Sequence, residues 1–316
     1  MSGDALIGAT GFVGSNLRAS RVFSDLYNSA NIHQSADRRF DSIVCAAAPG
    51  SMVAANRAPQ QDEAAIDNLI SHLRHISAGR AVLISTIATL TDFGVGQTED
   101  TSAFEEVLAY GRNRRKLETF FAGHFQDHLI VRLPALFGPG LRKNLIFDLL
   151  NPAPSMLTEE RREQLSQALP ADLWRVLGPW YVFEPATGMW TLDRSALDGS
   201  AAREQIEAAI ETAGFEALRF TNPASTFQFF DLSLLSDTID LAQNAGIRTL
   251  HVAPEPLSAN AVVRALRGAP MQESKAKVHT EDMRTRHANL FGRSGQYGAS
   301  ADDVLQQLTT FVNGAR

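Results

Sequence analysis

Short apolar runs alternate with segments of helical periodicity along the first half of the chain. The first run, residues 5–7, leads directly into Gly8, and a helical pattern follows in which Leu17 faces inward and Asn16 faces outward. Further strands are predicted over residues 22–27, 42–48, 81–86 and 129–133, and helices over about 59–75 and 104–121. Strands that alternate with helices predict βαβ units around a parallel sheet.

The regular alternation stops after the segment Gly138-Pro139-Gly140. Prolines then separate shorter elements, and all three tryptophans of the chain follow, which we expect in a core: Trp174, Trp180 and Trp190. A helix at about 232–244 and a strand at 248–252 resume the pattern. We therefore predict an α/β protein whose first domain covers residues 1–145 with a later contribution from about 225–253. A smaller, mostly C-terminal substrate domain would cover residues 146–224 and 254–316.

Three glycines at intervals of three follow the first strand: Gly8, Gly11 and Gly14. In this position the first permits a tight turn, the second lets a pyrophosphate approach the backbone, and the third lets helix and strand pack closely. Free N–H groups at the helix start, around Phe12 and Val13, would bind the phosphates. The pattern predicts a Rossmann-type doubly wound sheet that binds a dinucleotide; a purely structural turn is the alternative.

The end of the second strand bears on the choice of dinucleotide. An acidic residue there would hold both ribose hydroxyls of NAD, but the strand ends at Asn28 and Ser29. Neutral groups do not repel a 2′-phosphate, so NAD and NADP are both allowed and NADP is slightly favoured. Asp37 lies further on and is interpreted as a solvated loop residue.

Composition narrows the function classes. With 29 Lys and Arg against 35 Asp and Glu the net charge is −6, which disfavours binding to nucleic acid. No apolar run approaches the roughly 20 residues that span a bilayer. The single cysteine, Cys45, predicts a buried core residue, and the eight histidines lack metal-ligand spacing, so no metal site is expected. We expect a cytoplasmic protein with no membrane partner.

Several motifs together resemble the extended short-chain dehydrogenases/reductases of the nucleotide-sugar epimerase/dehydratase type. The resemblance is strongest over residues 4–145 and rests on the glycine turn together with Ala46-Ala47, Ser85-Thr86, Tyr110 with Arg114, Pro134, and Asn144-Leu145. It implies a dinucleotide bound along the glycine turn, Asn28, Ser29, Ala46, Ala47, Ser85, Tyr110, Arg114 and Pro134. It also implies a nucleotide-linked sugar held by Asn144, and an arginine against the substrate diphosphate near Arg286, for which a solvated loop residue is the alternative. Apart from the resemblance, Gln228 is a polar residue in an aromatic run and a candidate contact to a base or sugar, with ordinary strand alternation as the alternative.

Tyr110 is the predicted acid/base, with Thr86 holding the substrate oxygen. A tyrosine with a pKa near ~10 needs a cation to act as a base at neutral pH, and Arg114 lies one helical turn away. The family carries lysine at that position, so the planar guanidinium is a departure. Two interpretations stay open: a working Tyr110–Arg114 pair, or a surface pair on a protein that binds NAD(P) without chemistry.

A second departure concerns the residues after Thr86. The family's dehydratases carry Asp-Glu there, whereas this chain has Ile87-Ala88, which argues against dehydration. The sequence thus predicts an NAD(P)-dependent epimerase or ketoreductase for an activated sugar. The alternative is a non-catalytic NAD(P)-binding sensor or scaffold. A small-molecule substrate is expected in the first case, and a homodimer is compatible with the sequence.

Overall fold

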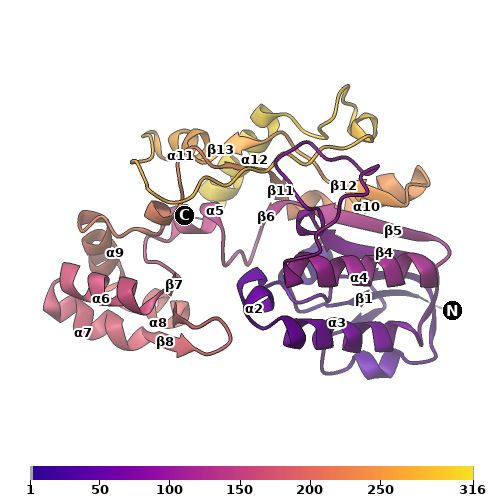
Figure 1. Cartoon of the computed structure of the whole chain (residues 1–316), viewed down its shortest axis with the longest axis horizontal. Coiled ribbons are helices and arrows are strands. Elements are labelled where there is room, and N and C mark those ends of the chain that lie inside the picture. Colours follow the sequence, from indigo (N-terminus) through magenta and orange to yellow (C-terminus); the bar gives the residue numbers. More distant parts are fainter. Residues whose placement is uncertain (1–2, 316) are drawn as a thin grey trace. The chain divides into compact units, whose positions relative to one another are not determined.

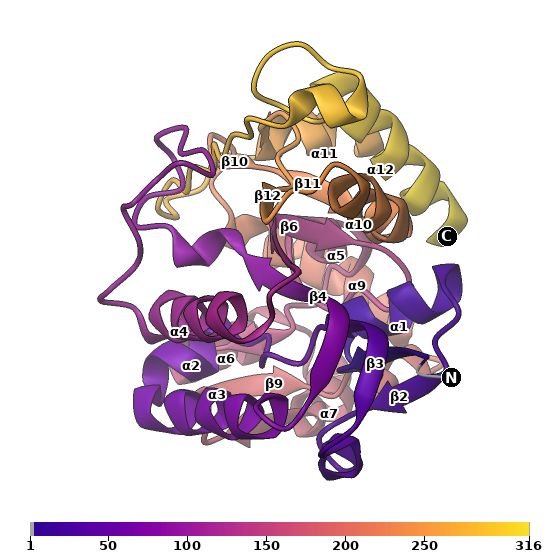
Figure 2. The same cartoon turned by 90° about the vertical axis from the view of Figure 1, so that its right-hand side faces the viewer.

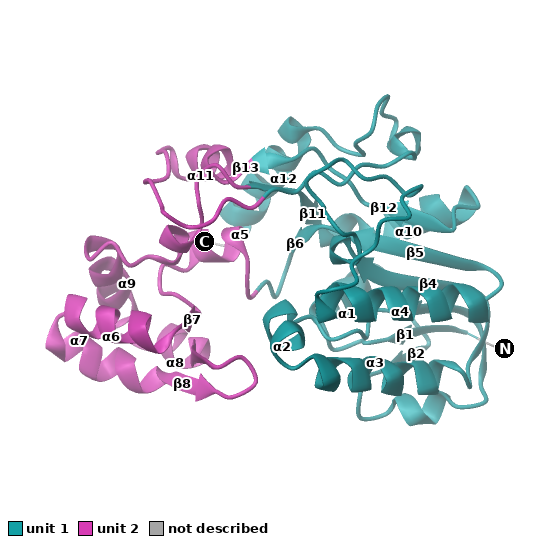
Figure 3. Cartoon of the chain, in the orientation of Figure 1, with its two compact units in different colours: residues 1–141, 226–257, 280–316 teal, residues 142–225, 258–279 magenta. Residues whose placement is uncertain are grey.

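The computed structural model of the chain (Figure 1) describes residues 3–315. It contains two compact units, which Figure 3 distinguishes by colour. Unit 1 comprises Met1–Leu141, Thr226–Leu257 and Thr280–Arg316, and unit 2 comprises Arg142–Ser225 and Ser258–His279. Within the described residues no helix is both long and apolar enough to cross a membrane.

Unit 1 is built on a six-stranded sheet with the order β12-β5-β4-β3-β1-β2. Every neighbouring pair in it is parallel. The strands are β1 (Asp4–Ile7), β2 (Asp25–Tyr27), β3 (Arg39–Cys45), β4 (Ser77–Thr86), β5 (His128–Leu133) and β12 (Thr249–His251). The Rossmann-type class is therefore confirmed. The chain leaves β1 toward β2 and then crosses to β3 on the other side of β1, so a topological switch point lies between β1 and β3.

Helices cover both faces of this sheet (Figure 2). On one face the apolar side of α3 (Pro59–Leu73) and of α4 (Ala109–His124) packs against the strands. On the other face α1 (Phe12–Ser20) and α10 (Leu235–Asn244) do the same. The strands are buried on both sides, which explains their nearly continuous apolar sequences.

Helix α4 begins later than its periodicity predicts, at Ala109 rather than Phe104. Phe104 instead forms an isolated antiparallel bridge with Leu90. The carboxylate of Glu105 accepts hydrogen bonds from the backbone N–H groups of Val107 and Leu108, at 2.7 and 2.9 Å. These contacts satisfy the backbone ahead of the helix in a non-helical form, and so delay its start.

The remaining elements of unit 1 lie outside the six-stranded sheet and the four helices named above. β6 pairs in parallel with β11 outside the main sheet. Their bounds, with those of the other elements, are β6 (Ala135–Phe137), β11 (Phe229–Asp231), β10 (Thr226–Phe227), α2 (Met52–Arg57), α12 (Ala301–Ala315) and the 3₁₀ turns η1 (Ile32–Ser35), η2 (Ile87–Thr89), η5 (Leu232–Leu234) and η6 (Ala288–Phe291). β13 (Leu257–Ser258) lies at the boundary between the two units.

Unit 2 combines short helices with a three-stranded antiparallel sheet of order β7-β9-β8. Its elements are β7 (Met156–Leu157), β8 (Tyr181–Glu184), β9 (Met189–Leu192), α5 (Leu145–Leu150), α6 (Glu159–Ala168), α7 (Ala171–Leu177), α8 (Arg194–Asp198), α9 (Arg203–Thr212), α11 (Ala259–Arg267), η3 (Gly178–Trp180) and η4 (Ala217–Phe220). The three tryptophans pack against the core of this unit, as the sequence predicts.

The C-terminal segment departs from the predicted division of the chain. The sequence places all of residues 254–316 with the second domain, but residues 280–316 belong to unit 1. The backbone N–H groups of Asp282 and Arg284 donate to the carbonyls of Phe93 and Gln97, at 2.5 and 2.9 Å. This polar, irregular segment is therefore joined to the loop after β4 by hydrogen bonds that leave no apolar periodicity in the sequence.

Candidate active site

The glycine turn lies at the topological switch point of the sheet. Gly8 follows β1 with a φ of +92°, a conformation that favours glycine. A Cβ built on Gly8 would lie 2.4 Å from the carbonyl oxygen of Ala46, which follows β3, and one on Gly14 would lie 2.1 Å from the carbonyl oxygen of Gly8. Both positions require glycine because backbone packs directly against them.

Gly11 is free of this constraint. A Cβ there would meet only the carbonyl oxygen of Gly8, at 3.4 Å, so this side of the turn is open to other atoms. Helix α1 starts at Phe12 with Gly11 as its N-cap, without a side-chain cap and without an acidic residue in its first turn. Its first N–H groups, including that of Val13, can therefore bind an anion. The residues present fit a dinucleotide pyrophosphate.

The Gly138-Pro139-Gly140 segment lies against the start of α1. The side-chain amide of Asn16 donates to the carbonyls of Phe12 and Pro139, at 2.8 and 3.0 Å. Asn16 is buried, so its predicted outward orientation is wrong. The position of Asn16 on the helix did not indicate that it is buried, because the carbonyl it binds, that of Pro139, is 123 residues away in the sequence.

The end of β2 presents neutral groups. The side-chain oxygen of Asn28 accepts from the backbone of Ala30 in a local turn, next to the exposed Ser29. Asp25 lies at the start of the strand, where Arg38 hydrogen-bonds to it and lowers the pKa of its carboxyl. Asp37 is exposed, consistent with a solvated loop residue.

Two hydroxyl groups meet beyond β4. Thr86 ends the strand and caps η2 by accepting the N–H of Ala88 at 3.2 Å. The hydroxyl of Tyr110, on the first turn of α4, lies close enough to that of Thr86 for Thr86 to lower the pKa of the phenol. The backbone N–H of Tyr110 donates to the side chain of Asn56 at 2.9 Å, which ties this turn to α2. The structure thus brings together the two residues predicted to handle the substrate oxygen.

Arg114 lies beneath Tyr110 but is almost fully buried, with 3% of its side chain exposed. Its guanidinium carbon is 4.0 Å from the centroid of the Tyr110 ring. Its nitrogens donate to the carboxylate of Asp62 at 2.5 Å and to the carbonyls of Pro49 and Tyr110. A side chain so enclosed acts on a ligand through its charge, so the predicted direct contact with a cofactor ribose lacks an exposed donor.

The expected effect of Arg114 on the tyrosine is also reduced. Burial raises the pKa of the Tyr110 phenol above its usual value of 10.0, and the charge of Arg114 and the Thr86 hydroxyl lower it only in part. The carboxylate of Asp62 opposes Arg114 by raising the same pKa. The side chain of Tyr110 is therefore a protonated phenol at neutral pH.

Ser85 faces away from this pair. Its hydroxyl donates to the carboxylate of Glu118 at 2.6 Å, and Arg132 binds the same carboxylate through two nitrogens at 2.7 and 2.9 Å. Burial alone would raise the pKa of Glu118, but Arg132, Ser85 and Arg115 outweigh it and lower that pKa. Ser85 therefore belongs to a buried polar network, although it was predicted to contact the cofactor.

This network reaches the C-terminal segment. Arg132 donates to Nε2 of His251 at 3.0 Å, and Nδ1 of that ring donates to the carbonyl of Arg284 at 2.9 Å. Burial lowers the pKa of His251 and keeps the ring neutral. The prediction did not include Glu118 and His251, but an arginine inside an apolar strand, Arg132, was a signal that a buried partner exists.

Other predicted residues hold different places. Pro134 is buried between β5 and β6, and Ala47 packs against the core beneath α3 and α4. Asn144 lies in unit 2, where its side chain caps α5 and its φ is +110°. Arg286 is exposed and pairs with Asp100. Asn144 and Arg286 stay predictions as substrate contacts.

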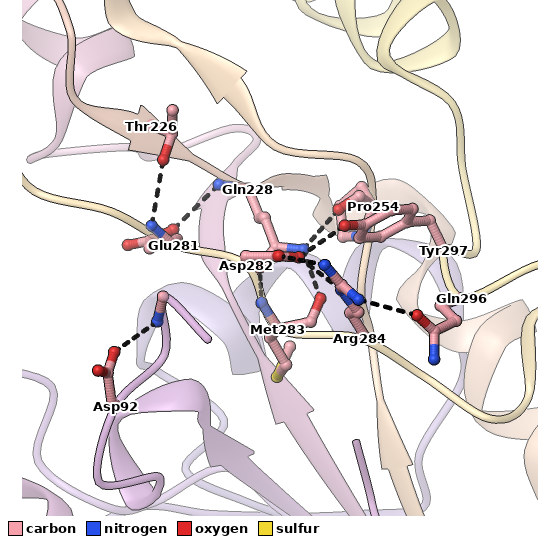
Figure 4. Close-up of polar contacts among 11 residues, drawn as sticks. Asp92, Thr226, Gln228, Pro254, Glu281, Asp282, Met283, Arg284, Gln296 and Tyr297 are labelled. Atoms are coloured by element: carbon pink, nitrogen blue, oxygen red, sulfur yellow. Dashed lines mark hydrogen bonds and ion pairs between the residues drawn. The ribbon is translucent and has the colours of Figure 1, made fainter. Parts of the chain in front are cut away.

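Gln228 is not available to a substrate. Its side chain is fully buried, and its amide nitrogen donates to the carbonyls of Pro254 and Met283 at 2.6 and 2.7 Å (Figure 4). Its oxygen accepts the N–H of Met283 at 2.7 Å. In the same view Arg284 binds Asp282. Gln228 is therefore a structural residue that fixes the C-terminal segment.

No protein-family model and no curated protein matches the chain. Solved structures match it over nearly its whole length. A UDP-N-acetylglucosamine 4-epimerase from Methanobrevibacter ruminantium, in complex with UDP-N-acetylmuramic acid, is 11% identical with a TM-score of 0.61, covering 99% of this chain and 97% of that one. A dTDP-4-dehydrorhamnose reductase from Bacillus anthracis, in complex with NADP, is 13% identical with a TM-score of 0.60, covering 99% of both.

A third structure, MoeE5 in complex with UDP-glucose and NAD, is 15% identical with a TM-score of 0.55 and covers 99% of this chain and 98% of that one. Identities this low establish a shared fold and leave activity open. The chain therefore has the fold of nucleotide-sugar epimerases and reductases, as its resemblance to the extended short-chain dehydrogenases/reductases predicts.

Proposed function

We propose that the protein is an NAD(P)-dependent enzyme that reduces or epimerises a nucleotide-linked sugar, with Tyr110 as its acid/base. The observation that carries this proposal is that the Thr86 side chain at the end of β4 and the Tyr110 phenol on the first turn of α4 lie near each other. The pair follows β4, at the same carboxyl edge of the sheet as the open glycine turn after β1. Ligands of doubly wound sheets bind at this edge.

The dinucleotide would be held by the backbone of the glycine turn. Its pyrophosphate would lie against Gly11 and the N–H groups of Phe12 and Val13, and its adenosine half beside Ala46 and Ala47. NADP is slightly favoured over NAD because Asn28 and Ser29 bring no carboxylate to the adenosine ribose. The structures of similar fold include one with NAD and one with NADP, so both cofactors suit this fold.

The chemistry of the chain's own residues is proton transfer. A bound nicotinamide would exchange a hydride with a carbon of the substrate, which no side chain can do. Thr86 would hold the substrate oxygen, and Tyr110 would donate a proton to that oxygen as it gains charge. A protonated Tyr110 suits the reduction of a carbonyl.

The substrate class follows from the neighbours and from the residues after Thr86. Structures of the same fold are named for UDP- and dTDP-linked sugars. Ile87 and Ala88 are buried in η2 and offer no acid or base, so the proposed reaction does not include dehydration.

Two measurements test this function. Nicotinamide released from the denatured, purified protein, assayed in both oxidation states, shows whether cofactor is retained through purification, which is expected of an epimerase and not of a reductase. Thermal unfolding with NADP and a panel of nucleotide sugars should show stabilisation by both ligands. Cofactor binding without turnover of any stabilising sugar would support the non-catalytic sensor, and absence of cofactor binding would overturn both interpretations.

A further inference from the structure

Asp62 and Arg114 form an ion pair inside unit 1. Their side chains are 5% and 3% exposed, and their closest atoms are 2.5 Å apart. The same carboxylate oxygen of Asp62 also accepts the amide of Asn113 at 2.8 Å. A buried carboxylate is tolerated only when it is paired and hydrogen-bonded, and these two donors on α4 fulfil that condition for a residue on α3.

The pair holds the planar guanidinium of Arg114 next to the ring of Tyr110. The guanidinium of Arg114 is bound on one side by Asp62 and on others by the carbonyls of Pro49 and Tyr110. Its face lies against the aromatic ring, with 4.0 Å between the guanidinium carbon and the ring centroid. Of these anchors only Asp62 carries a charge, so it is the strongest restraint on where the cation lies.

We propose that Asp62 is a positioning residue for Tyr110: its carboxylate holds the Arg114 guanidinium against the tyrosine ring and offsets the positive charge beneath the tyrosine hydroxyl. The proposal rests on the function proposed above for Tyr110. Its consequence is that Asp62 adds to the effect of burial and helps to keep the tyrosine a phenol, which can give its proton to a substrate oxygen and regain one from water.

The charges around Tyr110 can be assigned group by group. On the elements packed against α4, the charged residues are Arg57 of α2, Asp62, Glu63 and Asp67 of α3, Arg80 of β4 and Arg132 of β5. Glu63 and Asp67 pair with Lys116, and Arg132 pairs with Glu118. The charges with the largest effects on the Tyr110 hydroxyl are those of Arg114 and Asp62, and their effects have opposite signs.

The test is an ultraviolet titration of tyrosine in the protein without cofactor or substrate. The chain has four tyrosines, so subtracting the curve of Tyr110→Phe isolates Tyr110. Asp62→Asn leaves the Arg114 charge unopposed and should lower the pKa of Tyr110. Asp67→Asn is the matched control: it removes the same charge from the same helix and should leave the titration unchanged.

An Asp62→Asn variant that is folded and titrates like the wild type would overturn the proposal. If that variant does not fold, the titration midpoint of Tyr110 is compared between Arg114→Gln and the double variant Asp62→Asn/Arg114→Gln. The tyrosine absorbance is recorded after a rapid pH jump, before the protein unfolds in alkali. Tyr110 must then titrate at least about one unit higher in the single variant, where Asp62 is unopposed, and equal midpoints overturn the proposal.

A failure of the proposed function looks different. If the protein turns over no nucleotide sugar, the titration shift in Asp62→Asn persists, because it needs no substrate. With a substrate in hand, the alkaline fall in reduction rate should move to lower pH in Asp62→Asn by the same shift as the titration. A structural role alone would change the rate at every pH without moving this limb.

Discussion

The two halves of the carboxyl edge of the sheet are built by different means. At the switch point, Gly8 and Gly14 are required by backbone packing, and Gly11 leaves the surface open. Beyond β4, the site depends on side chains: Tyr110 rests on Arg114, and Arg114 is held by Asp62 from another helix. A backbone site is encoded by spacing along the chain, whereas a side-chain site is encoded by partners distant in sequence.

The largest expected effect is on turnover, from a substitution in the part of the site that is built of side chains. Tyr110→Phe keeps the ring on Arg114 and removes only the hydroxyl, so turnover should fall by about 10²–10⁴-fold while cofactor affinity stays near the wild-type value. Steady-state kinetics and a cofactor titration measure the two quantities. Wild-type turnover in this variant would mean that another group transfers the proton.

The buried network next to this site should be costly to disrupt. Glu118→Gln removes the charge that pairs with Arg132 and should lower the free energy of unfolding by about 3–5 kcal/mol at neutral pH. Because the pKa of Glu118 is lowered in the folded protein, its contribution is present above the unfolded value and is lost as pH falls through the folded value.

The free energies of unfolding of the wild type and of Glu118→Gln should therefore converge under acid conditions. Denaturant unfolding at several pH values would show this. Glu63→Gln is the matched control, because its exposed pair with Lys116 is worth at most about 1 kcal/mol. A loss in Glu118→Gln no larger than this control would contradict the account of the network.

A smaller effect, on stability, is expected for substitutions in the glycine turn. Gly14→Ala places a Cβ 2.1 Å from a carbonyl oxygen and should destabilise the protein by about 1–3 kcal/mol. Gly11→Ala meets its nearest atom at 3.4 Å and should fold with nearly wild-type stability. Chemical denaturation of both variants decides the matter, and equal losses would show that the two glycines do not differ in role.

The sequence predicted most of the fold for a physical reason. Apolar runs and helical periodicity define the parallel sheet and its covering helices, and the glycine spacing defines the turn at the switch point. The site was predicted less completely. Thr86 and Tyr110 do meet, but Arg114 and Ser85 bind buried carboxylates, on Asp62 and Glu118, and neither carboxylate has a signature in its local sequence.

Long-range hydrogen bonds explain the remaining differences. Gln228 was predicted as a substrate contact because it is a polar residue in an aromatic run, whereas its side chain makes three hydrogen bonds to Pro254 and Met283, far along the chain. The irregular residues 280–300 were assigned to the wrong domain because backbone hydrogen bonds, which have no signature in hydrophobic periodicity, join them to the loop after β4. Periodicity cannot report such contacts.

The central claim is that the glycine turn binds NAD(P), and one cofactor titration tests it most directly. Reduced NADP and reduced NAD are titrated into the wild type, into Gly11→Asp, and into Gly123→Asp, where a Cβ on α4 would meet nothing within 4 Å. Saturable binding is expected in the wild type and in Gly123→Asp. Gly11→Asp, folded by circular dichroism, should show none, because its carboxylate occupies the approach of the pyrophosphate and repels it. Unchanged affinity in a folded Gly11→Asp would contradict the claim.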